Sequence, residues 1–131
     1  MAESFLAPAR TPTNTLALID ERTGSVVASA VEIAEKSADR RRGLLGRDGL
    51  DPSAALIIAP CSSVHTFFMR FVIDVVFVAR DGRVVKIARD LKPWRIAGSL
   101  RAHAVVEMAG GAAARNDVRL GDRFVLQDSI L

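Results

Sequence analysis

Cysteine and histidine are scarce in this 131-residue sequence, and tyrosine is absent. Cys61 is the single cysteine, which excludes an intramolecular disulfide framework and a zinc site built from several cysteines. The two histidines, His65 and His103, form no short-spaced ligand pair, so we expect no metal or other cofactor. No uninterrupted apolar run reaches about 18 residues, which argues against a membrane-spanning helix.

A large charge of one sign is also missing. Eighteen basic residues face 15 acidic ones, for a net charge of +3. The two signs alternate along the chain, as they do on a mixed, solvated surface. We therefore expect neither nucleic acid nor a membrane as a partner. Half of the residues are apolar and a quarter are charged, a balance typical of an ordinary globular core.

The N-terminal segment lacks the long apolar stretch of a secretory signal, because Pro8, Arg10 and Pro12 interrupt it. We expect residues 1–14 to form a flexible tail and residues 15–131 to form a single globular domain. A cytoplasmic location is expected, in agreement with one unpaired cysteine.

Seven segments rich in valine, isoleucine and leucine predict strands. They cover residues 15–20, 25–33, 55–59, 73–79, 84–88, 104–108 and 123–127. Asp81 and Gly82 form a strong hairpin signal, and most connections are short. The sequence therefore predicts a mainly β fold with one or two short helices (α+β), arranged as a compact, mostly antiparallel small barrel or sandwich.

The most helical segment spans residues 37–46. Ser37 is placed to cap its start, and Asp39 lies in the first turn, where the helix dipole favours an acid. Arginines follow toward the other end, where the dipole favours cations. Gly46 or Gly49 is expected to end the helix.

Residues 60–74 concentrate aromatic, basic and acidic side chains, a mixture suited to an apolar pocket with a few polar anchors. We expect its wall to comprise Phe67, Phe68, Met69 and Trp94, and its anchors to be Arg70, Asp74 and Glu107. Aromatic platforms with carboxylates and arginine suit sugars or other polyols. A small-ligand-binding domain is the leading hypothesis, with a protein-interaction module, marked by an exposed apolar patch or open strand edge, as the alternative.

Asp74 precedes a strongly apolar strand, where an ionised acid needs a partner. Arg70 and Arg42 are the candidate partners. The carboxylate either orients a ligand hydroxyl or amine, or closes a loop through a structural pair; the pattern alone favours the structural pair.

Several other residues keep two interpretations open. His65 is either a general base or metal ligand, or a hydrogen-bonded core residue, and the second is more common. Cys61 would need a lowered pKa to act as a nucleophile. Glu107 is either an edge-strand charge or a pocket acid, and Trp94 either a loop anchor or a lid. An acid/base enzyme would require Asp74, Glu107 and His65 to converge in one cleft.

Five elements, taken in order, resemble those of the domain-of-unknown-function 192 (DUF192) family. They are Arg42–Arg47 (RGLLGR), His65–Arg70 with Ile73–Phe77 (HTFFMR and IDVVF), Asp81–Val85 (DGRVV), Val105–Gly111 (VVEMAGG) and Leu120–Asp122 (LGD). The resemblance implies a compact β-rich fold with little helix and no established enzyme activity. A buried Arg–Asp pair that joins the helix to the sheet would explain several of the motif residues.

The candidate ligand-binding set combines residues of the motifs with residues of the expected pocket. It comprises Arg42, Arg47, His65, Phe68, Met69, Arg70, Asp74, Trp94 and Glu107. The expected partner is a small molecule or, in the alternative, a protein.

Overall fold

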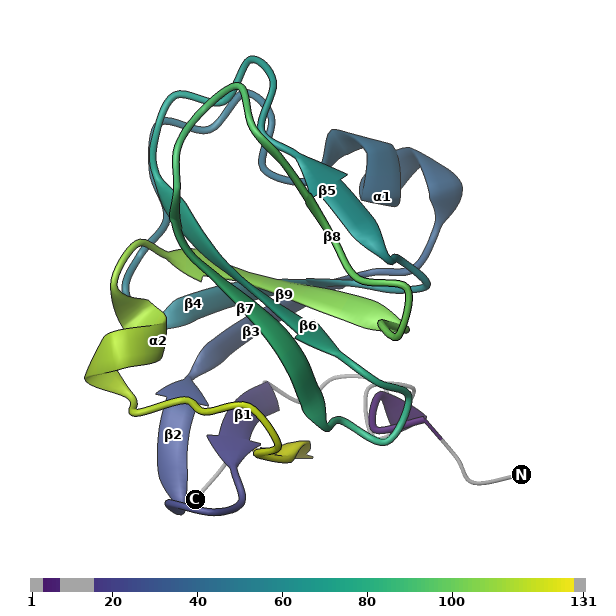
Figure 1. Cartoon of the computed structure of the whole chain (residues 1–131), viewed down its shortest axis with the longest axis vertical. Helices are drawn as coiled ribbons and strands as arrows, with labels where there is room; N and C mark the ends of the chain where they lie inside the picture. Colours follow the sequence, from purple (N-terminus) through teal and green to yellow (C-terminus); the bar gives the residue numbers. More distant parts are fainter. Residues whose placement is uncertain (1–3, 8–15, 129–131) are drawn as a thin grey trace.

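The computed structural model describes residues 4–7 and 16–128 and arranges them in three sheets and two short helices (Figure 1). The strands are β1 (Leu16–Asp20), β2 (Ser25–Ala28), β3 (Ala30–Ala34), β4 (Ala54–Ile58), β5 (Ser63–His65), β6 (Ile73–Val78), β7 (Val84–Leu91), β8 (Ile96–Gly98), β9 (Ala104–Ala109) and β10 (Phe124–Asp128). The helices are α1 (Ser37–Arg42) and α2 (Ala112–Arg115).

A five-stranded sheet, ordered β3-β4-β9-β6-β7, forms the middle layer. The three-stranded sheet β10-β1-β2 and helix α2 cover one face, and the β5–β8 ribbon with α1 lies over the other (Figure 1). All strand pairs are antiparallel except β3 with β4. The expected mainly β, α+β architecture is confirmed, in a sandwich-like form without a closed barrel.

Both faces of the central strands β4, β6 and β9 are buried, which explains why these strands read as nearly continuous apolar runs. Along β6, Val76 and Val78 pack into the core shared with the three-stranded sheet. The alternate residues Val75 and Phe77 pack into a second core beneath β5 and α1. The period-2 alternation of a strand therefore divides one apolar segment between two cores.

The predicted strand 25–33 is in fact two strands. β2 pairs antiparallel with β1, whereas β3 pairs in parallel with β4, so the chain crosses between sheets at Ser29. The Ser29 and Ala30 amides both donate to the carbonyl of Ser53. A valine-rich sequence does not indicate where the chain changes from one strand partner to another.

The predicted helix is shorter than expected. It ends at Gly43, which has a φ of +48° and donates its N–H to the Asp39 carbonyl, and not at Gly46 or Gly49. Ser37 is the first helical residue and makes no capping bond; its Oγ accepts from Arg40 instead. Glycine ends this helix early because it enters the positive-φ region easily.

Part of the expected tail belongs to the packed structure. Leu6 is 2% exposed and lies in the core shared with the three-stranded sheet. The amide of Phe5 donates to the carbonyl of Arg80 at 3.1 Å. Residues 1–3 and 8–14 of the predicted tail lie outside the described residues.

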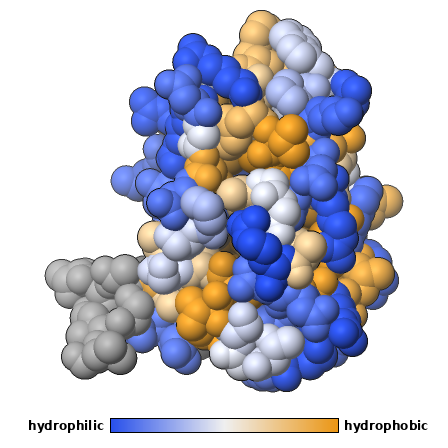
Figure 2. Space-filling model, turned by 90° about the vertical axis from the view of Figure 1, so that its left-hand side faces the viewer, coloured by the Kyte–Doolittle hydropathy of each residue, from blue (hydrophilic) through white to orange (hydrophobic). Residues whose placement is uncertain are grey.

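The surface is mixed, as the charge pattern predicts. Figure 2 shows one face on which hydrophobic patches are separated by hydrophilic residues. Neither described helix has the length and apolar character needed to cross a membrane.

Candidate functional site

A cavity of about 320 Å³ lies on the face of the middle sheet that carries α1 and β5. Gly43 turns the chain at the end of α1, and Leu44 then inserts into the core at 2% exposure. Side chains from β4, β5 and β9 complete the walls. The lining comprises Arg40, Arg41, Arg42, Gly43, Leu44, Leu45, Ile58, Cys61, Ser63, Val64, His65, Met69 and Glu107.

Glu107 is the buried acid of this cavity. It sits in the middle of β9, opposite Leu56 of β4 and Val75 of β6, and is only 5% exposed. Its Oε2 is enclosed and has no hydrogen-bond partner among the described residues. Burial raises the pKa of Glu107 to about 7, against the opposing positive charge of Arg47. A buried polar atom without a partner is uncommon in native proteins and costs free energy.

Arginines of α1 border the same cavity. Arg40 donates to the Glu35 carbonyl and to Ser37 Oγ, which holds it along the helix. The side chains of Arg41 and Arg42 are exposed and make no hydrogen bond or ion pair within the part of the chain that the structure describes. The suggested pairing of Arg42 with Asp74 is therefore wrong.

Cys61 and His65 also line the cavity. The thiol of Cys61 donates to the Ser63 carbonyl at 3.1 Å. Burial raises the pKa of this thiol, and the charge of Glu107 acts in the same direction, which disfavours a nucleophilic thiolate. His65 is exposed, and its Nδ1 accepts from the amide of Phe67 at 3.3 Å, so the expectation of a core histidine is wrong.

Asp74 lies on the other face of the sheet. Its Oδ1 accepts from the amide of Asp90 at 2.8 Å, and its Oδ2 accepts from the amide of Ala113 at 2.9 Å. It is 1% exposed and joins β6 to β7 and to the first turn of α2. These bonds give Asp74 a structural role, but its partners are backbone amides and not the arginines expected from the sequence. Asp74, Glu107 and His65 do not converge in one cleft.

Two arginines of the candidate ligand-binding set form ion pairs elsewhere. Arg70 Nη1 lies 2.6 Å from Asp48 Oδ1, and both side chains are largely exposed. Arg47 Nη2 lies 2.9 Å from Glu32 Oε2. Arg70 is therefore not a partner of Asp74, and neither arginine lines the cavity.

The aromatic residues form a separate cluster beside the cavity. Trp94 stacks on Phe67, with ring centroids 5.5 Å apart. The ring centroid of Phe68 lies 4.7 Å from that of Trp94. His65 stacks on Phe67 and so links this cluster to the cavity wall. Phe68 and Trp94 both have a φ of +66°, in the left-handed region.

Buried Thr66 joins the segment that carries Phe67 and Phe68 to the segment that carries Trp94. Its hydroxyl donates to the Lys92 carbonyl at 2.6 Å and accepts from the Arg95 amide at 2.9 Å. Its carbonyl accepts from the amide of Trp94 at 3.0 Å. These bonds account for the unusual backbone of Trp94, since surrounding structure must hold a strained residue in place.

The structure thus divides the predicted site. Arg42, His65, Met69 and Glu107 line the cavity. Arg47, Phe68, Arg70, Asp74 and Trp94 do not. From the sequence, Arg40 and Arg41 are either phosphate- or nucleic-acid-binding residues or part of a solvated helix face, and the second is favoured. Leu44 is not placed at a site from the sequence, although it lies within the RGLLGR element.

The model of the family described as uncharacterized ACR, DUF192, matches residues 18–126. This chain belongs to the DUF192 family.

The chain is similar to the UPF0127 protein PH1112 of Pyrococcus horikoshii, which is 35% identical over 101 residues, 72% of this chain and 84% of the relative. A protein of unknown function from Novosphingobium aromaticivorans has a similar crystal structure, with a TM-score of 0.72 and 26% identity over 83% of this chain and 81% of that one. A structure named as a candidate transcription regulator, from Sinorhizobium meliloti, gives a TM-score of 0.74 at 24% identity over 87% of this chain and 92% of that one, a likeness of fold alone.

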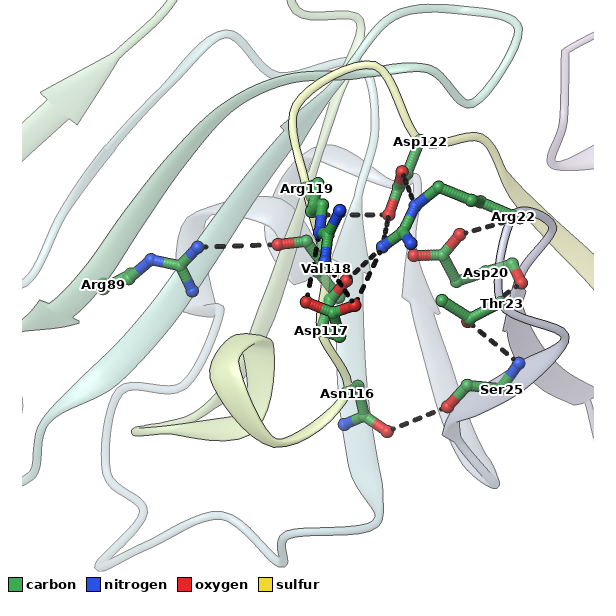
Figure 3. Close-up of polar contacts among 10 residues, drawn as sticks. All are labelled: Asp20, Arg22, Thr23, Ser25, Arg89, Asn116, Asp117, Val118, Arg119 and Asp122. Carbon is green, nitrogen blue, oxygen red and sulfur yellow. Dashed lines mark hydrogen bonds and ion pairs between the residues drawn. The ribbon is translucent and has the colours of Figure 1, made fainter.

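The last DUF192 element, Leu120–Asp122, has a structural role (Figure 3). The Asp122 carboxylate accepts hydrogen bonds from Arg22 Nε at 2.7 Å and Nη2 at 3.2 Å, and from the Arg119 amide at 2.9 Å. Burial acts to raise the pKa of Asp122, but hydrogen bonds from Arg22, Asp20 and the Arg119 amide hold it at about 2. Burial and the bond to Asp122 raise the pKa of Asp20 to about 6. This cluster fastens the β1–β2 turn to the segment before β10.

Proposed function

We propose that this DUF192 protein is a small-ligand-binding domain whose ligand occupies the cavity between α1 and the middle sheet. The observation that supports it most directly is the enclosed Oε2 of Glu107, which lacks a hydrogen-bond partner among the described residues. Most buried polar side-chain atoms in proteins have a partner. Glu107 is 5% exposed at the cavity, and a ligand hydroxyl or amine would pair with this oxygen once the side chain turns toward the cavity.

The cavity chemistry favours a hydroxyl-rich molecule such as a sugar or polyol. An ionised Glu107 accepts from a ligand hydroxyl, and a protonated one donates to it, so the group suits partners that do both. Val64 and Met69 provide an apolar wall. A volume of about 320 Å³ is near the small end of ligand sites, which suits a molecule the size of a single sugar.

The test is a thermal-shift screen of the purified protein against sugars and polyols, followed by calorimetric titration of each hit. A ligand at about 100 times its Kd stabilises a protein by roughly 2.7 kcal/mol, which is a readily measured shift. E107Q keeps the shape of the side chain and is expected to weaken binding at least tenfold. The matched control is E35Q, because Glu35 is exposed and does not line the cavity.

Two outcomes contradict the proposal. One is a screen in which no sugar or polyol shifts the melting temperature. The other is a hit that binds E107Q as tightly as the wild type, which would place that ligand away from Glu107.

A protein-interaction module is the second candidate function, favoured by the aromatic cluster. Phe68 is 72% exposed and Trp94 is 55% exposed, and both stand on a backbone that Thr66 holds in place. Large exposed aromatic side chains are enriched at interface hot spots. Under this function, a purified partner would lose affinity for W94S or F68S and bind E107Q normally; the ligand-binding function predicts that only E107Q affects the ligand.

A further inference from the structure

We infer that the ligand of this cavity carries a negative charge in addition to its hydroxyl groups, as a sugar acid or a sugar phosphate does. The inference rests on the proposed ligand-binding function and specifies the chemical class of the ligand. Its basis is the unequal distribution of charge in the cavity, with an acid in its buried part and arginines at its edge.

The cavity lining is strongly cationic. Arg40, Arg41 and Arg42 line it, and Glu107 is its one acidic residue among those described. Of the neighbouring acids, Glu32 is paired with Arg47 and Asp48 with Arg70. Glu35 and Asp39, at the start of the α1 segment, do not line the cavity. A concave site of one dominant sign attracts ligands of the opposite sign.

The two kinds of charge occupy different parts of the cavity. Glu107 is 5% exposed in the middle of the sheet, whereas Arg41 and Arg42 are exposed on the helix. Arg40, Cys61 and Glu107 all line this one cavity. A ligand that satisfies both would place hydroxyls toward Glu107 and its anionic group toward α1.

Arginine is the side chain best suited to a carboxylate or phosphate. Its planar guanidinium donates two parallel hydrogen bonds to such a group and stays charged at any physiological pH. Arg41 and Arg42 are engaged with no other described side chain, so their donors are available for a ligand. Arg40 is held by Glu35 and Ser37 and contributes its charge.

The test compares neutral and anionic forms of the same sugars by calorimetric titration. The probes are D-glucose, D-glucuronate and D-glucose 6-phosphate, with D-galactose and D-galacturonate as a second set. We expect an anionic form to bind at least tenfold more tightly than its neutral counterpart in about 0.1 M NaCl. The advantage should shrink in about 1 M NaCl, where the Debye length falls from about 10 Å to about 3 Å. The uronate and phosphate arms show which anion the site takes.

Variants assign the effect to α1. The double variant R41Q/R42Q is expected to weaken the anionic probes at least tenfold and to leave the neutral sugars unchanged. R101Q is the control, because Arg101 is exposed and lies outside the cavity lining. E107Q is expected to weaken the neutral and anionic probes alike.

The outcomes separate this inference from the function on which it rests. If neutral and anionic sugars bind equally and R41Q/R42Q changes neither, the charge inference is overturned while ligand binding stands. If the anions bind E107Q as tightly as the wild type, they bind the arginines from outside the cavity, and the inference is overturned. If no probe binds the wild type, both proposals fail.

Discussion

Asp74 and Glu107 lie on adjacent strands, one register position apart, and point to opposite faces of the sheet. Asp74 is opposite Met108, and Val75 is opposite Glu107. Both carboxyl groups are almost fully buried. Asp74 accepts two backbone hydrogen bonds, whereas Glu107 Oε2 accepts none among the described residues. Asp74 therefore has a structural role, whereas Glu107 keeps a buried oxygen without a partner among the described residues, in the wall of the cavity.

Removal of the Asp74 carboxylate should lower the unfolding free energy of the protein without affecting the cavity. D74A leaves the amides of Asp90 and Ala113 without their acceptor, at a cost of about 3 to 5 kcal/mol of unfolding free energy. D74N should cost less, because its carbonyl oxygen still accepts one of the two bonds. Urea denaturation measures both values.

Ligand titration on D74N provides the control for this prediction. Because Asp74 is on the other face of the sheet, folded D74N should bind a cavity ligand as the wild type does. A D74A protein of unchanged stability would contradict the structural role assigned to Asp74.

Glu107 should make stability depend on pH near neutrality. Burial raises its pKa from 4.5 to about 7, so this contribution to stability is complete below about pH 4.5 and is lost as the pH rises through 7. At about 1.4 kcal/mol per pKa unit, ionised Glu107 costs the fold on the order of 3 kcal/mol. E107Q cannot ionise and should become more stable than the wild type between pH 5 and about 8.

The measurement is the unfolding free energy of wild type and E107Q across that range, with E35Q as control. Their difference isolates Glu107, since every other titrating group is common to both proteins. A constant difference from pH 5 to 8 would show that Glu107 ionises in the folded protein at its ordinary pKa.

Asp20 and Asp122 should respond in opposite ways to amide substitution. Asp122 is anionic at neutral pH and accepts from Arg22 and Arg119, so D122N should cost about 2 to 4 kcal/mol. Asp20 Oδ2 has no partner while both acids are ionised, and it bonds to Asp122 when Asp20 is protonated. The amide of D20N donates that bond at every pH.

The pH dependence of D20N follows from the raised pKa of Asp20. In the wild type, the contribution of Asp20 is complete below about pH 3.8 and is lost as the pH rises through about 6. In thermal denaturation, the stability of D20N relative to the wild type should therefore increase between about pH 4 and 7. Equal destabilisation by D20N and D122N would show that the two acids do not share a proton.

Alanine substitutions at Gly82 and Gly121 separate the cost of a steric clash from the cost of backbone conformation. A Cβ at Gly82, where φ is +91°, would lie 2.2 Å from the carbonyl oxygen of Phe124. At Gly121, with a φ of +88°, it would meet nothing within 4 Å. G121A should cost about 1 to 2 kcal/mol through conformation only, and G82A more than about 3 kcal/mol, since a non-glycine φ strain of that size adds to the clash. Chemical denaturation of both variants tests the order, and equal losses would contradict it.

Much of this fold could be predicted from the chain itself. The apolar runs around Ile57, Val76 and Val106 predict buried strands because an interior strand needs apolar side chains on both faces. Asp81–Gly82 predicts its hairpin because glycine tolerates the backbone the turn requires. The split at Ser29 was not predictable, since either strand partner satisfies the same valines.

The site was only partly predictable for a related reason. Local composition alone shows that Glu107 interrupts an apolar strand and that arginines cluster before Gly43. That these two segments border one cavity, and that Asp74 lies on the far side of the sheet, follows from the three-dimensional packing of the strands. The face on which a buried acid points depends on strand register, and register is decided by packing between segments distant in the chain.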